Sequence, residues 1–210
     1  MNNLYRAYGS FLEEKGYTFR TSAFLQWGQG TNSLGSFLLL NPGSSEPLKK
    51  SGFTNAEEVY ELKVDPTMRQ IGRLVSRINE SKPMDGRVQI YNLFSFKNPN
   101  SKSAINLYET ISQLQDTTIL NELPLLEELK QHPWMCYGWG IHKTSYRHLS
   151  VRKEKWLNHV KDSKIPTFGK LHSNGYDYYH ILPLLIKKRD QIIEDLAEEY
   201  VKCLNDPVKR

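Results

Sequence analysis

The chain has only two cysteines in 210 residues, Cys136 and Cys203, and they form no C-x-x-C pair. So few cysteines argue against a zinc site, an iron–sulfur cluster or a disulfide framework. We therefore expect no metal and no cofactor. Both cysteines are expected to be small buried side chains.

Apolar runs are short throughout the chain, and none approaches the roughly 20 residues that a membrane helix needs. The first six residues, from Met1 to Arg6, also lack the apolar core of a signal peptide. The sequence therefore predicts a cytoplasmic protein that has no membrane partner.

The composition is that of an ordinary soluble globular protein, with 39% hydrophobic and 24% charged residues. The length suits one domain with a full core, and we expect a single domain spanning 1–210 that is a monomer. The net charge of +5 and the pI near 9.0 fit a nucleic-acid partner. Many proteins without such a partner are equally basic, so the charge alone decides nothing.

Strand and helix patterns alternate along the chain without repeats or low-complexity linkers. This alternation predicts an α/β fold, a three-layer α/β/α sandwich with a central, mostly parallel four-stranded sheet. We expect residues 1–35 to form a helix (1–16) and an edge strand, residues 36–184 the core that bears the motifs, and residues 185–210 a C-terminal helix. The four core strands are expected at 36–40, 87–96, 134–138 and 164–168. Asp65-Pro66 is expected to cap and begin a helix.

The first motif lies where an apolar strand meets a polar loop. Residues 37–40 are all large and apolar, and Asn41-Pro42-Gly43-Ser44-Ser45 follows directly. Pro42 removes a backbone donor and Gly43 permits a positive φ, so a tight loop is expected here. Open parallel sheets place ligand sites at such strand ends. The alternative is a turn in which Asn and Ser side chains cap local backbone groups.

The second motif is Asn92, near the end of the next strand, with Phe94 and Phe96 after it. A side-chain amide offers both a donor and an acceptor, as the edge of a pyrimidine requires, and either ring could stack on a base. The alternative is that Asn92 bonds a neighbouring strand end while the phenylalanines fill the core. For the phenylalanines, core packing is the preferred interpretation.

The third motif is the segment 168–183, which is rich in Gly, Ser and Tyr and contains His172 and His180. A histidine in such a loop can hydrogen-bond a departing anion, and tyrosines can line a nucleic-acid groove. Taken singly, either histidine is more often a surface or capping residue.

Together these motifs carry a resemblance. Residues 37–45 resemble the first motif of the uracil-DNA glycosylase superfamily, nearest its mismatch-specific uracil/thymine branch. Residues 65–69 are similar to that branch's helix start, residues 90–94 to the superfamily's middle strand, and His180 with Pro183 to its last motif. The whole pattern, with Trp139-Gly140 after the third strand, is still more similar to an uncharacterised family known as domain of unknown function 1643.

Two departures from the superfamily pattern bear on activity. Its His-Pro pair is interrupted here by Ile181 and Leu182, so the final loop can differ in backbone and His180 can point elsewhere. Asn41 stands where the fastest uracil glycosylases have an acidic residue. A neutral amide orients water but takes no proton, so slow turnover is expected.

The resemblance implies a DNA glycosylase that hydrolyses the N-glycosidic bond of uracil or a modified pyrimidine flipped out of DNA. Asn41 would position the water, and His180 would donate to the base oxygen that gains charge. The implied base contacts are Asn92, Phe53 and Phe94. The candidate DNA contacts are Gly43, Ser44, Ser45, Arg69, Lys97, Lys143, Arg147 and Arg152. The expected partner is single-stranded, mismatched or base-modified DNA.

Two other functions stay open. One is a catalytically silent nucleic-acid-binding module of the same fold, which the interrupted His-Pro pair favours. The other is a hydrolase of small nucleosides or nucleotides, because an Asn-Pro-Gly loop can hold a small ligand equally well. The glycosylase and the binding module should both bind DNA tightly and in a salt-sensitive way, whereas a hydrolase of small nucleosides or nucleotides should not.

Overall fold

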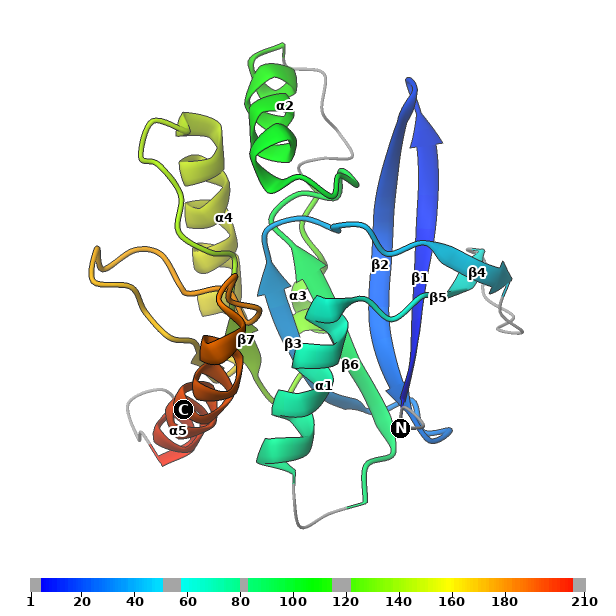
Figure 1. Ribbon diagram of the computed structural model, residues 1–210, viewed down its shortest axis with the longest axis vertical. Helices are drawn as coiled ribbons and strands as arrows, with labels where there is room; N and C mark the ends of the chain where they lie inside the picture. The colour runs from blue at the N-terminus through cyan, green and yellow to red at the C-terminus, as the bar shows by residue number, and fades with distance from the viewer. Residues whose placement is uncertain (1–4, 51–57, 80–82, 115–121, 206–210) are drawn as a thin grey trace.

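The structure is a computed structural model that describes residues 5–50, 58–79, 83–114 and 122–205. It is a mixed α/β fold in which helices flank an eight-stranded sheet (Figure 1). The strands are β1 (Tyr5–Glu14), β2 (Tyr17–Trp27), β3 (Ser33–Leu39), β4 (Pro47–Lys50), β5 (Val59–Leu62), β6 (Gly86–Asn92), β7 (Met135–Tyr137) and β8 (Thr167–Phe168). The helices are α1 (Pro66–Ile78), α2 (Ser101–Gln113), α3 (Leu126–Leu129), α4 (Arg147–Ser163) and α5 (Arg189–Asn205), with a 3₁₀ turn at Ile186–Lys188.

The sheet combines two kinds of strand pairing, in the order β4-β5-β1-β2-β6-β3-β7-β8. β6, β3, β7 and β8 pair in parallel, whereas β4, β5, β1 and β2 pair antiparallel. β6 joins the halves because it is parallel to β3 and antiparallel to β2. The prediction of a four-stranded, mostly parallel sheet is therefore wrong: antiparallel strands double its width.

The prediction of a helix at residues 1–16 is also wrong, because residues 5–14 form β1. β1 and β2 form a long hairpin that pairs Glu14 with Tyr17 across a two-residue turn. Lys15 and Gly16 have φ values of 51° and 78°, the left-handed conformation at both positions that suits a tight hairpin. Pairing with β2 along the whole strand, and with β5 at Ala7–Ser10, thus overrides the helix-favouring residues near Glu13.

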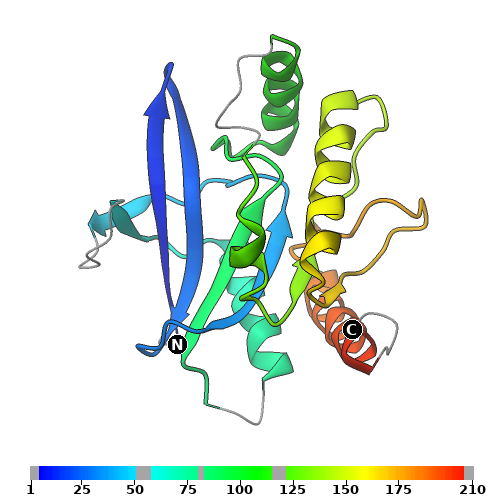
Figure 2. The ribbon, with the colours of Figure 1, turned by 180° about the vertical axis from the view of Figure 1, so that it is seen from behind.

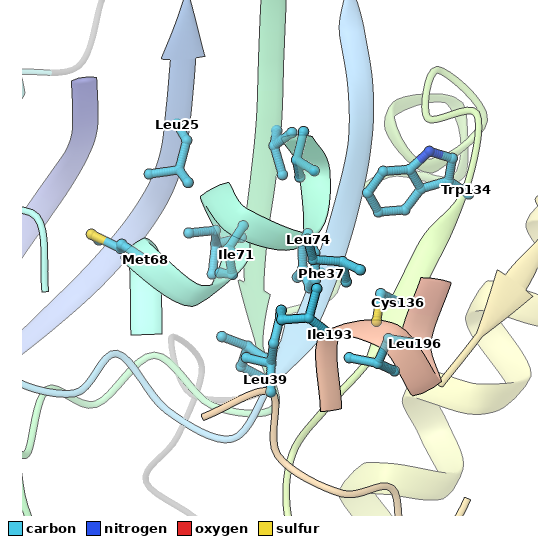
Figure 3. Close-up of a cluster of buried hydrophobic side chains, with 14 of the residues drawn as sticks. Leu25, Phe37, Leu39, Met68, Ile71, Leu74, Trp134, Cys136, Ile193 and Leu196 are labelled. Atoms are coloured by element: carbon cyan, nitrogen blue, oxygen red, sulfur yellow. The ribbon is translucent and has the colours of Figure 1, made fainter. Parts of the chain in front are cut away.

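β3 lies at the centre of the core because both its faces are covered. Phe37 and Leu39 pack in the cluster under α1 and α5, whereas Leu38 and Leu40 pack in the cluster under α2, α3 and α4. Figures 1 and 2 show these helix groups on opposite sides of the parallel strands, and Figure 3 shows the first cluster. A strand buried on both faces reads as an unbroken apolar run, which is why its sequence signal was clear.

The start of α1 confirms the expected cap. Asp65 accepts a hydrogen bond from Met68 N at 2.8 Å, and Pro66 occupies the first helical position. Cys136 and Cys203 are both buried and free, as expected. Among the described residues, no helix has both the length and the apolar character that crossing a membrane requires.

A partly buried chain of hydrogen bonds links β3, β6 and α3. Ser33 Oγ lies 2.7 Å from His132 Nδ1, and Tyr91 Oη lies 2.8 Å from His132 Nε2. Tyr91 donates to Glu128 Oε1 at 2.5 Å, so its oxygen is free to accept from His132 Nε2–H. A neutral imidazole therefore satisfies both neighbours, with Ser33 donating to Nδ1.

We expect this histidine to make the fold acid-sensitive. Burial lowers the pKa of His132 from 6.5 to about 4. Between those pH values the unfolded chain binds a proton that the folded chain does not, so stability falls as the pH drops from about 6.5 to about 4. The loss should reach about 3 kcal/mol in urea unfolding measurements. His132→Gln should remove this part of the pH dependence; an unchanged slope in that variant would contradict the assignment.

Candidate functional site

A cavity of about 480 Å³ opens at the carboxyl end of β3. Its walls come from the loop after β3, the first turns of α1 and α2, and two segments that follow β7 and β8. Asn41, Gly43, Ser44 and His180 are the predicted site residues that line it. Gly43 has a φ of 65°, so the tight loop expected from the sequence is present. The volume lies within the range of small-molecule pockets.

Asn41 is held in place by its own side chain. Its Nδ2 donates to Asn98 O at 2.7 Å, which joins the loop after β3 to the loop before α2. Within the described residues, Asn41 Oδ1 has no hydrogen-bond partner. A fixed amide with a free carbonyl oxygen can accept a hydrogen bond from one water molecule or ligand group.

His180 presents a neutral ring to the cavity. Burial lowers its pKa, and the nearby His142 lowers it further, whereas contacts with Leu182 and the charge of Asp65 act in the opposite direction. Leu182 N donates to His180 Nδ1 at 3.1 Å. Nδ1 also lies 3.3 Å from Leu182 O, and the shorter contact with Leu182 N favours the tautomer in which Nδ1 accepts and Nε2 carries the proton. His180 Nε2–H is therefore a candidate donor to a bound ligand.

The segment after β7 brings a second histidine, which the sequence did not single out. His142 Nε2 donates to Trp139 O at 2.7 Å, since a carbonyl oxygen can only accept. Burial is the largest of the effects that lower the pKa of His142. Gly140, between these residues, has a φ of 87° and turns the chain so that Trp139, Gly140 and His142 all line the cavity.

A buried ion pair supports this wall from behind. Lys153 Nζ lies 2.5 Å from Asp177, and the two side chains are only 3% and 2% exposed. The same carboxylate accepts from Trp139 Nε1 at 3.2 Å and from His142 N at 3.3 Å. Asn174 Nδ2 supplies a further bond at 3.0 Å. Asp177 therefore fixes the two cavity-lining residues that it contacts.

Arg20 is the least expected residue in the cavity wall. It lies on β2, is 5% exposed, and has no hydrogen-bond partner for Nε or Nη1 among the described residues. Burial lowers its pKa to about 10, and the charge of Asp65 acts against this shift, so the guanidinium stays charged at neutral pH. The sequence signal was a single arginine inside an apolar strand, and it was missed because 17–27 was interpreted only as an edge strand.

Asn92 does not line the cavity. Its surroundings fix the orientation of its amide: Nδ2 donates to Asn41 O at 3.0 Å, and the side-chain oxygen accepts from Arg20 Nη2 at 3.3 Å. Asn92 thus joins the ends of β6 and β3 to β2. The sequence left two interpretations of Asn92 open, reading of a base or a bond to a neighbouring strand end. The arrangement matches the second.

Other candidate residues lie outside the cavity. Phe94 is buried and stacks on Tyr108 with ring centroids 4.6 Å apart, so it fills the core as the preferred interpretation held. Ser45 is buried too, and its Oγ donates to Lys63 O at 3.0 Å. Phe53 lies outside the described residues.

The predicted DNA-binding cations do not gather around the cavity. Arg69 is exposed and donates to Val64 O, and Lys97 Nζ lies 5.7 Å from the centre of the Phe11 ring. Lys143 and Arg147 are exposed. The expectation for Arg152 is wrong: it is 2% exposed and donates to Leu93 O and Glu122 O, inside the fold.

Metal ligands do not cluster in the described part of the chain, where no three His, Cys, Asp or Glu side chains gather closely enough to hold an ion. Comparisons of the chain with protein-family models, curated proteins and solved structures found no match, so the resemblance to the uracil-DNA glycosylase superfamily stays a prediction from the sequence.

Proposed function

We propose that the cavity is the active site of an N-glycosyl hydrolase that releases uracil or a modified pyrimidine from DNA. The main support is that Asn41 and His180, which are far apart in the sequence, line the same cavity. One is a fixed amide with a free acceptor, and the other is a neutral imidazole with a candidate donor.

Each residue has a defined part in the reaction. Asn41 Oδ1 accepts a hydrogen bond from a water and aims its oxygen at the anomeric carbon. As the new C–O bond forms, the bond from sugar to base breaks and its electron pair stays on the base. His180 Nε2–H donates to the base oxygen that shares this charge. The amide accepts no proton, so the proton from the water passes to solvent or to the departing base.

Asn92 takes a different role from the base reading implied by the resemblance. Its amide nitrogen holds the Asn41 carbonyl at 3.0 Å, so it is a positioning residue for the loop that carries the water-binding amide. Recognition of the base edge then falls to backbone and hydroxyl groups that line the cavity, such as those of Gly43, Ser44 and Ser101.

The test is strand cleavage by alkali after incubation with oligonucleotides that contain uracil, mismatched uracil or thymine, or modified cytosine. We expect Asn41→Ala to reduce base release by about 100-fold, because it removes the water acceptor. His180→Gln should reduce it by about 100-fold as well, through loss of the donor to the leaving base. Asn106→Ala, an exposed change on α2, is the matched control and should retain full activity.

Intact strands with every substrate would overturn the proposal. If DNA still binds without cleavage, the chain is a nucleic-acid-binding module. Base release that Asn41→Ala leaves unchanged would place the reaction elsewhere in the molecule.

A second candidate function is the same hydrolysis on a free nucleotide. The observation that favours it is the position of positive charge: Arg20 is the one cation among the described residues that line the cavity. Lys143 and Arg147, two of the predicted DNA contacts, are exposed and do not line it. Release of free base from deoxyuridine monophosphate, with no reaction on oligonucleotides, would select this function.

A further inference from the structure

The guanidinium of Arg20 is a buried cation with unused donors. The side chain is 5% exposed, and Nε and Nη1 have no acceptor among the described residues. One contact, from Nη2 to the Asn92 amide oxygen at 3.3 Å, fixes the group without neutralising it. Burying an unpaired charge is unfavourable, and proteins that retain such a charge at a cavity generally use it there.

Two helices begin at the same cavity. Pro66 and Thr67 of α1 and Ser101 of α2 all line it, and each helix is 13 residues long. Helix N-termini carry partial positive charge and free backbone N–H groups, and they are common binding sites for phosphate. The guanidinium and the α2 N-terminus therefore place positive potential at one point, and α1 adds its helix dipole, although Pro66 has no N–H and Met68 N is already bonded to Asp65.

The protein supplies little negative charge to balance this potential. Asp65 is the acidic residue whose charge acts on Arg20, but its Oδ1 already caps Met68 N. It forms no ion pair with Arg20 in the described structure. Asp65 lines the cavity too, so it weakens anion binding without filling the site.

We propose that Arg20 and the N-termini of α1 and α2 bind a phosphoryl group of a nucleotide inside the cavity. A phosphoryl group offers several oxygens, enough to pair with the charge of the Arg20 guanidinium and to accept from hydroxyls such as Thr67 and Ser101. This inference goes beyond the proposed reaction, because phosphate binding requires no hydrolysis. The phosphoryl group belongs either to a free nucleotide or to a nucleotide within DNA.

The first measurement is calorimetric titration with inorganic phosphate. The wild type should bind phosphate saturably, and Arg20→Gln should weaken binding by about 10- to 100-fold, as expected for lost charge-assisted hydrogen bonds. Arg20→Lys should retain intermediate affinity, because it keeps the charge but loses the planar geometry. Arg73→Gln, which removes an exposed arginine that does not line the cavity, should bind like the wild type.

The second measurement separates a ligand-binding arginine from a structural one. Without phosphate, Arg20→Gln should unfold at the same temperature as the wild type or higher, since an unpaired buried charge has been removed. Added phosphate should raise the melting temperature of the wild type but not of Arg20→Gln. If Arg20→Gln instead melts well below the wild type, or binds phosphate equally well, the proposal is overturned. Absence of phosphate binding by the wild type also overturns it.

Two nucleotide probes identify the source of the phosphoryl group. Deoxyuridine monophosphate should bind more tightly than deoxyuridine if a free nucleotide is the ligand. A uracil-containing oligonucleotide should bind in an Arg20-dependent way if DNA is the ligand. Base release by a wild type that does not bind phosphate would refute this inference alone, whereas phosphate binding without base release would refute only the proposed reaction.

Discussion

Replacing Asp177 with asparagine is expected to lower the free energy of unfolding by about 3 to 5 kcal/mol. The substitution leaves Lys153 charged in a site where its side chain is 3% exposed. The nearly isosteric amide keeps an acceptor for Trp139 but cannot balance that charge. Urea unfolding followed by Trp fluorescence measures the difference.

Two variants isolate the ion pair. Asp190→Asn breaks an exposed pair with Arg73, where Asp190 is 84% exposed, and should cost at most about 1 kcal/mol. Adding Lys153→Met to Asp177→Asn removes the unbalanced charge and should restore most of the lost stability. A cost below about 1 kcal/mol for Asp177→Asn would show that this pair does not stabilise the fold.

The same pair predicts a specific response to acid. Burial alone would raise the pKa of Asp177, but the hydrogen bond and charge of Lys153 outweigh it, so the pKa lies below the ordinary 3.8. The carboxylate therefore stabilises the fold fully above about pH 4, and this contribution is lost as the pH falls through the lowered pKa. Asp177→Asn should flatten the stability curve in that range.

Replacing Gly35 with alanine should lower stability by about 2 to 6 kcal/mol, the sum of backbone strain and overpacking. Gly35 has a φ of 143°, and a Cβ there would overlap the ring of Trp134. That ring cannot yield easily, because it is 2% exposed and packs edge-on against Phe37 and Phe168. Thermal unfolding should show the loss.

A second glycine provides the matched control. Gly175 also has a positive φ, 72°, but a Cβ there would meet no atom within 4 Å. Gly175→Ala should therefore cost only the strain, about 1 to 2 kcal/mol. Equal losses of stability on substitution of Gly175 and Gly35 would mean that overlap with the Trp134 ring does not contribute to the effect at Gly35.

Local signals in the sequence were sufficient where neighbouring residues alone determine the structure. The cap at Asp65 and Pro66 acts within one turn of helix, and the apolar run 37–40 identifies a strand buried on both faces. The prediction for the β1 segment was wrong because its conformation depends on pairing with strands outside the segment. β2 and β5 decide it, and no local pattern in Tyr5–Glu14 opposes a helix strongly.

The candidate site divides in the same way. Asn41 and His180 were predicted from loops that end strands, and both line the cavity. Arg20 and Asp177 were missed because their importance arises from long-range packing. Arg20 comes from the antiparallel half of the sheet, which the prediction lacked, and Asp177 meets Lys153 only after the final loop folds back onto α4.

The ends of the eight-stranded sheet also bear on how separate copies of the chain behave at high concentration. β4 is one end: it has four residues, begins with Pro47, and carries Lys49 and Lys50. β8 is the other end, with two residues packed against α5. Short, charged, proline-bearing or covered edges offer few free backbone groups to a strand of another molecule. The two end strands are thus poor templates for pairing with a strand of another molecule.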